Sequence, residues 1–448
     1  MTTVDRRVGA VERRTEVVER RAEVVGHRTE VFERRTEVVE RRTEVRALSE
    51  LGLTELGKAS TGIHETHRAV SDRIFGAVRW GVGPAVAPVK AVHDAITDGV
   101  YLVVAESMAT AGKVGGLAGD LPLKRSPSTT KAGAAIIAAL NGLIGDELDA
   151  RQSPLADPMS VRVGGRPVPL TGDGIAAAFP GATGRIVVAL HGLVETEYSW
   201  SIGEAEPYAP RLAREGVTTV FLRYNTGRRI STNGRDLAEL LDELVRRWPV
   251  PVESIGLLGH SMGGLVARSA AHYGRQAGHG WVAKVTASVS LGTPHLGAPL
   301  ESLAHHGSAG LMRLPETKAF GRLLRRRSGG IRDLRAGSIV DEDWTGRDPD
   351  DLARAAASEV ELLPGAEHYF VSATVTRSPR NPLARIIGDG LVLHHSASGE
   401  NSTRRIGFDP ANGLHLNKSN HFTLLNDPRV AERLVAWFAN PEREVPRP

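Results

Sequence analysis

From residue 185 onward, short apolar runs alternate with longer amphipathic stretches. The runs 185–190 and 217–222 are continuous and rich in β-branched residues, which is typical of strands buried on both faces. Residues 236–248 place leucines at helical spacing, and strand-like runs return at 285–291 and 368–373. This alternation predicts an α/β fold with a mostly parallel, doubly wound sheet covered by helices on both faces.

The composition changes along the chain, and it predicts three parts. Residues 1–46 are a low-complexity heptad repeat whose apolar residues are adjacent rather than spaced for a coiled coil, so we expect a marginal helix or disorder. Residues 47–155 have helical patterning and form a predicted helical N-terminal region. Residues 156–448 hold the alternating pattern of the catalytic domain, and 300–365 interrupt it as a cap or lid insertion.

Composition excludes several functions. The 448 residues contain no cysteine, so thiol nucleophiles, thiolate metal sites and disulfides are excluded. A net charge of +4 is too small to indicate a nucleic-acid partner. No sequence feature indicates an oligomeric state. Apolar runs are shorter than the roughly 18 residues that span a bilayer, and no secretory signal is visible, so a cytoplasmic protein is expected.

The amphipathic pattern of residues 47–150 has two interpretations. Such helices are compatible with peripheral contact to a membrane surface. Packing against the neighbouring domain is the preferred interpretation. His64 and His67 are spaced i, i+3 rather than i, i+4 as in zinc proteases, so no metal site is predicted there.

The motif G-x-S-x-G spans Gly259 to Gly263 and centres on Ser261. A short apolar strand precedes it and a helical stretch of small residues follows, which is the context that a nucleophile elbow requires. The two glycines provide room for a sharp turn that exposes the serine hydroxyl. The motif therefore predicts Ser261 as a nucleophile at the carboxyl end of a strand.

A neutral serine hydroxyl needs a base, and the base needs an orienting acid. His421 precedes the last predicted helix and is the preferred base, with His415 as the second candidate. Asp389 lies between glycines after the strand at 368–373 and is the preferred acid, with Asp409 as the alternative.

An acyl-transfer site also needs backbone N–H donors for the oxyanion. Met262 follows the nucleophile and supplies one. Leu193 supplies the other, after the supporting residues His191 and Gly192 at the end of the strand 185–190. This chemistry requires no cofactor and no metal.

Residues 160–440 resemble the α/β-hydrolase superfamily, in its lipase and esterase branch, and most of all the triacylglycerol-lipase and GPI-inositol-deacylase relatives. The resemblance rests on Gly259-His260-Ser261-Met262-Gly263-Gly264, His191-Gly192, Gly292-Thr293-Pro294-His295, Gly388-Asp389-Gly390 and His421. It implies a Ser261–Asp389–His421 triad in the family's chain order, with Leu193 and Met262 as oxyanion donors. No Gly-Gly run follows His191-Gly192, so the hormone-sensitive-lipase pattern is absent.

The leading hypothesis is a serine hydrolase that cleaves small-molecule carboxylic esters or lipids through an acyl-enzyme. An acyltransferase with the same triad differs only in its acceptor, and sequence does not separate the two. A non-catalytic lipid-surface binding protein is the third hypothesis, and the intact serine, aspartate and histidine argue against it.

Overall fold

The computed structural model describes residues 37–48, 50–51, 125–298, 328–346, 357–376, 388–389 and 391–439. Residues 37–48, at the end of the heptad repeat, are helical. The predictions for residues 1–36 and 52–124, including the two histidines discussed above, lie outside the described residues. The same holds for 300–327 and 347–356 of the predicted insertion. The boundary after residue 155 stays a prediction.

The core of the molecule is one eight-stranded sheet with the order β2-β1-β4-β3-β5-β6-β7-β8. β1 pairs antiparallel with β2 and β4, and the other neighbours pair in parallel. The strands are β1 (Ser160–Val163), β2 (Arg166–Pro167), β3 (Arg185–Leu190), β4 (Val217–Arg223), β5 (Ser254–His260), β6 (Val285–Leu291), β7 (Glu367–Thr374) and β8 (Gly413–Asn417). The predicted mostly parallel sheet is confirmed.

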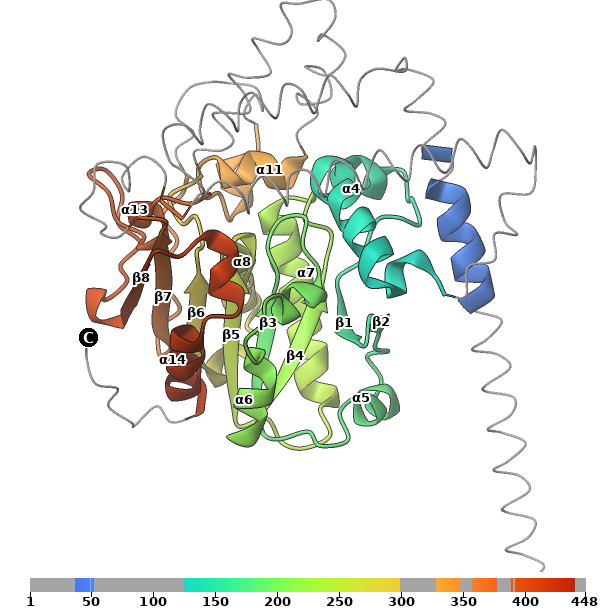
Figure 1. Ribbon diagram of the computed structural model, residues 1–448, viewed down its shortest axis with the longest axis horizontal. Helices are drawn as coiled ribbons and strands as arrows, with labels where there is room; N and C mark the ends of the chain where they lie inside the picture. The colour runs from blue at the N-terminus through green and yellow to red at the C-terminus, as the bar shows by residue number, and fades with distance from the viewer. Residues whose placement is uncertain are drawn as a thin grey trace, which may run out of the picture.

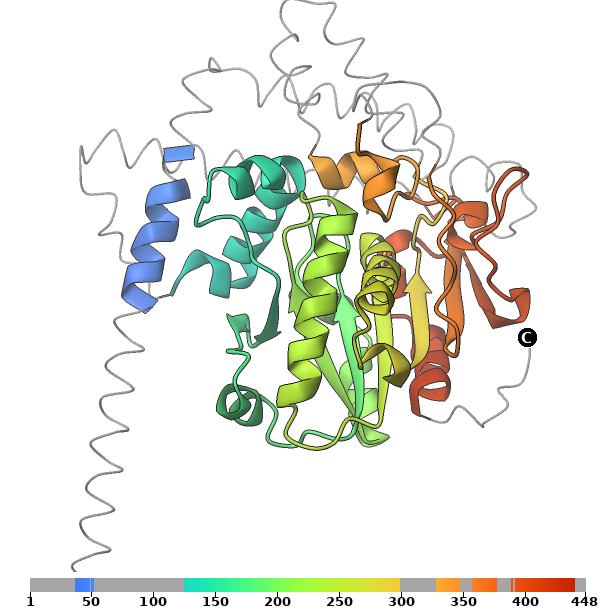
Figure 2. The same cartoon turned by 180° about the vertical axis from the view of Figure 1, so that it is seen from behind.

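Helices cover both faces of the sheet (Figures 1 and 2). On one face lie α6 (Tyr208–Arg214) and α14 (Pro428–Ala439), and on the other lie α7 (Ile230–Arg247) and α8 (Met262–Ala277). Above the carboxyl ends of the strands lie α4 (Lys131–Ala150) and α11 (Gly329–Leu334). Two short helices complete the described elements of this kind: α5 (Gly172–Ala178) and α13 (His394–Ala397).

The alternation of side chains along β3 shows why this strand is apolar throughout. Ile186, Val188 and Leu190 pack into the core beneath α7 and α8. Val187 and Ala189 point to the opposite face and pack into the core beneath α6 and α14. A strand buried on both faces has no solvent side, so it needs no polar residue.

Helix α7 begins earlier than its leucine spacing predicts, at Ile230 rather than Asp236. Tertiary contacts explain the extra turns. The Asp333 carboxylate of α11 accepts the Ile230 N–H at 2.8 Å, and a methyl group on Gly234 would meet Ser269 Oγ of α8 at 2.1 Å. Small and polar residues therefore continue the helix because α8 and α11 stabilise it there.

Strand β8 was not predicted from the sequence. It is only five residues long, at the edge of the sheet, and His415 lies within it rather than in a loop. Phe370 pairs with Gly413, where a methyl group would come within 2.4 Å of the Phe370 ring. A strand whose first residue must be glycine has little β-branched character to detect.

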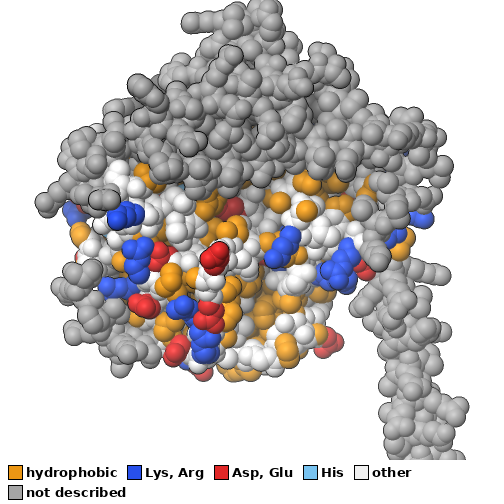
Figure 3. Space-filling view, in the orientation of Figure 1, with side chains coloured by type: hydrophobic (Ala, Val, Ile, Leu, Met, Phe, Trp, Pro, Cys, Tyr) orange, Lys and Arg blue, Asp and Glu red, His pale blue; other side chains and the backbone are white. Residues whose placement is uncertain are grey.

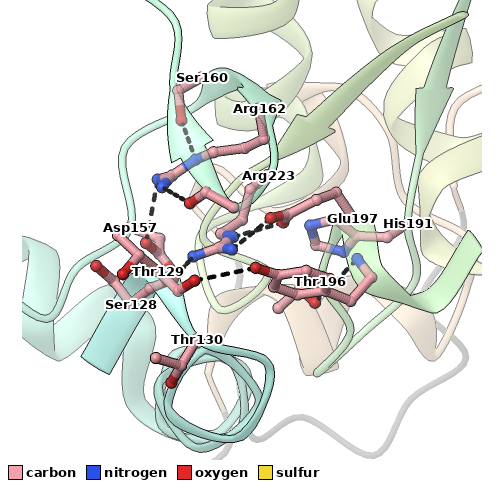
Figure 4. Close-up of polar contacts among 12 residues, drawn as sticks. Ser128, Thr129, Thr130, Asp157, Ser160, Arg162, His191, Thr196, Glu197 and Arg223 are labelled. Atoms are coloured by element: carbon pink, nitrogen blue, oxygen red, sulfur yellow. Dashed lines mark hydrogen bonds and ion pairs between the residues drawn. The ribbon is translucent and has the colours of Figure 1, made fainter. Parts of the chain in front are cut away.

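A buried polar network joins the segment before α4 to the end of β4 (Figure 4). Arg223, at the end of β4, makes a two-pronged ion pair with Glu197 at 2.5 and 2.7 Å. Its remaining Nη1 donates to the Ser128 carbonyl at 2.6 Å. Tyr198 donates to the Thr129 carbonyl at 3.0 Å. Residues 128–129 are thus fixed to β4 by charge-assisted hydrogen bonds.

The surface over α6 and α14 shows basic and acidic side chains scattered among apolar ones, without a patch of one sign (Figure 3). This fits the small net charge. Within the described ranges, no helix is both long enough and apolar enough to cross a membrane.

Candidate functional site

The backbone at Ser261 is strained. Ser261 has φ 53° and ψ −121°, outside the regions that residues with a Cβ ordinarily adopt. Its N–H donates to the Leu291 carbonyl of β6 at 2.8 Å. A methyl group on Gly259 would meet the Gly264 nitrogen at 2.3 Å, and one on Gly263 would meet the Leu190 carbonyl at 2.3 Å. The turn from β5 into α8 therefore requires glycine at both positions, and strain of this kind often marks functional sites.

His421 and Asp389 are hydrogen-bonded to each other. Nδ1 of His421 lies 2.9 Å from Oδ2 of Asp389, and both side chains are about 98% or more buried. Oδ1 of Asp389 accepts the N–H groups of Leu391 and Val392 at 2.9 and 2.7 Å. The His421 N–H donates to the Asp389 carbonyl at 3.1 Å. The carboxylate is thus held at both oxygens and fixes the imidazole through Nδ1.

This imidazole lies beside the end of β6, next to the serine turn. A methyl group on Gly292, which follows Leu291, would come within 3.1 Å of Nδ1 and Cε1 of His421. A methyl group on Gly192 would come within 3.0 Å of the Ser261 Cβ. Gly292 at the end of β6 thus lies against the His421 ring, and Gly192 after β3 lies against Ser261.

Burial and charge act in opposite directions on His421. Burial alone would lower the pKa of this imidazole, but the Asp389 carboxylate and its hydrogen bond, with a further contribution from Glu195, raise the pKa above 6.5. The neutral ring then carries its proton on Nδ1, facing Asp389, and leaves Nε2 free to accept one.

A second histidine–carboxylate pair lies beside the first, and sequence reasoning missed it. The Glu195 carboxylate contacts Nδ1 of His260 at 3.1 Å and accepts the Gly192 N–H at 2.8 Å. Nε2 of His260 lies 3.2 Å from the His421 carbonyl, and the two rings are 4.7 Å apart. Burial would raise the pKa of Glu195, but His260 and the Gly192 N–H lower it overall. No local motif marks Glu195, because its side-chain partner His260 is at the end of β5, and His260 in turn contacts the carbonyl of His421 in η7 (His421–Leu425).

The two predicted oxyanion donors follow the serine turn and the end of β3 along the chain. Met262 is the first residue of α8, so its N–H has no acceptor within its own helix. In the described part of the chain, no acceptor lies within hydrogen-bonding distance of the Leu193 N–H. The Gly192 N–H is different, because Glu195 occupies it.

The supporting residue His191 has a structural role. It is fully buried and stacks on Tyr224 with 4.5 Å between ring centroids. The Tyr224 hydroxyl donates to the His191 carbonyl at 2.6 Å. Burial lowers the pKa of His191 to about 4, so the ring is neutral and holds the end of β3 against β4.

The alternative residues lie elsewhere. His415 contacts the hydroxyls of Ser372 and Thr374 at 2.9 and 3.2 Å, and burial, with His394 adding to it, lowers its pKa to about 4. Asp409 is exposed and accepts the Ala411 N–H as the N-cap of the 3-10 helix η6 (Pro410–Asn412). Neither contacts the His421–Asp389 pair.

The family described as "PGAP1-like alpha/beta domain" matches residues 209–313, which include β5, Ser261 and α8. The sheet order and the turn at Ser261 agree with this match. Over these residues, the resemblance inferred from the sequence motifs is confirmed.

Several solved structures resemble this chain. The mature lipase BlEst2 of Bacillus licheniformis is 18% identical, with 56% of this chain and 90% of that chain covered and a TM-score of 0.37. The metagenomic carboxyl esterase MGS0156 is 16% identical, with coverages of 68% and 91% and a TM-score of 0.35. Staphylococcus hyicus lipase is 16% identical, with coverages of 58% and 93% and a TM-score of 0.32. A comparison with curated proteins finds no match.

A cavity of about 460 Å³ lies between α8 and the segment 359–363. Arg268 lines it, and Nε of this buried side chain has no acceptor in the described part of the molecule. Ser261, Asp389 and His421 do not line this cavity, so it is separate from the candidate site.

Proposed function

We propose that this chain is a serine hydrolase that cleaves carboxylic esters, lipids included, through an acyl-enzyme intermediate. One observation carries the proposal: the buried hydrogen bond between His421 and Asp389 ends beside the strained turn of Ser261. A nucleophile, a base oriented by a carboxylate and two backbone donors make up the machinery of acyl transfer.

The proposed reaction begins at Ser261 Oγ, which attacks the ester carbonyl carbon. Nε2 of His421 accepts the hydroxyl proton, and Asp389 stabilises the imidazolium that results. The carbonyl oxygen becomes an oxyanion, which the N–H groups of Leu193 and Met262 stabilise. The tetrahedral intermediate then expels the alcohol, which receives its proton from His421. Water attacks the acyl-enzyme by the same steps and releases the acid.

The test compares turnover of p-nitrophenyl butyrate by the wild type, Ser261→Ala and the control Ser398→Ala. Removing the nucleophile should lower kcat on the order of 10⁴-fold or more. Ser398 is half-buried in a turn after α13, and in the part of the chain that the structure describes its hydroxyl donates to the His395 carbonyl alone, so its removal should leave kcat unchanged. Circular dichroism verifies that all three proteins are folded.

Labelling with a fluorophosphonate gives a second readout, because this reagent modifies only an activated serine. The wild type and Ser398→Ala should be labelled, and Ser261→Ala should not. Turnover or labelling that persists in Ser261→Ala would rule out the proposed nucleophile. Release of free acid, rather than acyl transfer to an added alcohol, distinguishes hydrolysis from acyltransferase activity.

A further inference from the structure

Val194, next to the proposed oxyanion donor Leu193, has an unusual backbone conformation. Its φ is 57°, in the left-handed region, although valine is β-branched and adopts this region rarely. A conformation of this kind persists only where surrounding contacts enforce it. The contacts around Val194 therefore fix the backbone immediately after Leu193.

Helix α4 supplies one of these contacts. It approaches Val194 so closely that a methyl group on Gly142 would come within 2.3 Å of the Val194 Cγ1. On the other side, the Thr226 hydroxyl accepts the Val194 N–H at 3.3 Å. Val194 is thus held between a glycine of α4 and the loop that follows β4.

The same helix is fitted to the loop after β4. Asn225 Nδ2 donates to the Gly145 carbonyl at 2.8 Å, and a methyl group on Gly145 would overlap the Asn225 side chain at 1.9 Å. A methyl group on Gly227 would meet the Asn141 carbonyl at 2.0 Å. Between Gly142 and Gly145, Ile144 leaves helical geometry with φ −138°, so the helix kinks where it touches the loops.

Helix α11 holds α4 in place from above. Ser328 Oγ donates to the Gly142 carbonyl at 2.6 Å, and the Gly329 N–H donates to Asp146 Oδ2 at 2.8 Å. The Gly330 N–H in turn donates to the Gly227 carbonyl at 3.0 Å. Hydrogen bonds from the start of α11 therefore hold both α4 and the loop after β4 in place.

We infer that α4 is a positioning element of the site: through Gly142 it holds Val194 in the left-handed conformation and so fixes the backbone of the loop that carries the Leu193 N–H. This inference rests on the proposed function. It assigns Gly142, Val194 and Thr226 as positioning residues, since none of them touches the reacting atoms. It also gives residues 131–150, outside the predicted catalytic domain, a part in catalysis.

The test is a double-mutant cycle between Gly142→Ala and Val194→Gly, measured with p-nitrophenyl butyrate. In the wild-type background, Gly142→Ala displaces Val194 and should lower kcat about 10- to 100-fold with KM nearly unchanged, because complete loss of an oxyanion donor costs about 10²–10³-fold. In the Val194→Gly background the conflicting methyl group is gone, so the same change should lower kcat less than about 2-fold.

The matched control is Gly133→Ala on the same helix. Its methyl group would meet the Pro127 carbonyl at 2.3 Å, so the steric conflict is equal but lies away from Val194. Both alanine variants should lose a similar amount of thermal stability, and only Gly142→Ala should lose kcat. Affinity for phenylboronic acid, whose serine adduct is tetrahedral, should fall in parallel with kcat/KM.

Thr226 offers a test that does not depend on folding of the Gly142 variant. Thr226→Val removes the acceptor of the Val194 N–H and should lower kcat, and Thr226→Ser should restore it. Wild-type kcat in Gly142→Ala, equal loss in both backgrounds, or equal loss in Gly133→Ala would each overturn the inference. A wild-type protein without turnover or fluorophosphonate labelling would instead refute the proposed function.

Discussion

Nδ1 of His421 and Oδ2 of Asp389 are 2.9 Å apart, and protein atoms shield this hydrogen bond almost completely from solvent. The carboxylate also accepts two backbone N–H groups, so its orientation does not depend on the imidazole. A base held in this way is preorganised, and its proton affinity depends on the carboxylate.

The pH dependence of hydrolysis should report this relationship. The base must be neutral, and the pKa of His421 is raised above 6.5, so kcat/KM should fall as pH decreases through a pKa above 6.5. In Asp389→Asn, burial dominates, the pKa falls, and the acidic limb should move to lower pH. The plateau should also drop by about 10⁴-fold. A limb at the same pH in both proteins would contradict this prediction.

Gly292→Ala should lower activity by displacing the base. The added methyl group would lie 3.1 Å from Nδ1 of His421 and 2.9 Å from Leu424, and we expect kcat to fall about 10²-fold. Gly278→Ala is the matched control. Gly292 and Gly278 both have a positive φ, 57° and 71°, so alanine strains the backbone at either position, but no atom lies within 4 Å of a methyl group on Gly278. Steady-state kinetics and melting temperatures of the pair separate the two effects, and equal kcat in both variants would refute the prediction.

Glu195→Gln should shift the pH profile of kcat/KM without changing the shape of that profile. The substitution removes a negative charge that raises the pKa of His421, so the acidic limb should move to lower pH. It also weakens the contact to His260, and we expect kcat to fall about 10-fold. Glu204→Gln, at an exposed position, should change neither quantity. An unshifted acidic limb in Glu195→Gln would show that this carboxylate does not influence the base.

Glu197→Gln should destabilise the fold without touching the site. The change leaves the buried Arg223 guanidinium without its paired carboxylate, at a cost of about 3 kcal/mol in the free energy of unfolding. Urea titration followed by circular dichroism measures this quantity. Glu243→Gln breaks surface pairs with Arg246 and Arg247 and should leave the urea midpoint nearly unchanged. Equal midpoints for the two variants would exclude a stabilising role for the buried pair.

The alternation of apolar runs predicts most of the sheet, because a parallel strand buried on both faces must be apolar throughout. β8 escapes this pattern, since an edge strand that starts with a glycine lacks both continuous apolarity and β-branching. The early start of α7 escapes it as well, because the cap comes from Asp333, about a hundred residues away along the chain.

The turn at Ser261 could be predicted because its glycines and serine are adjacent in sequence. The contact between His421 and Asp389 could be anticipated, because loops after neighbouring parallel strands meet at one edge of the sheet. The contact of Glu195 with His260 could not, because no residue type or spacing indicates it. The contact of α4 with the loops after β3 and β4 could not be predicted either, because Gly142 and Gly145 look like ordinary residues of an apolar helix.

The anchorage of Arg223 also sets a practical limit on where the gene can be shortened. A protein that starts at residue 156 would lose the Ser128 carbonyl and so leave an interior guanidinium donor unsatisfied. The smallest independently folding piece should therefore begin ahead of Ser126, even though the first strand starts only at residue 160.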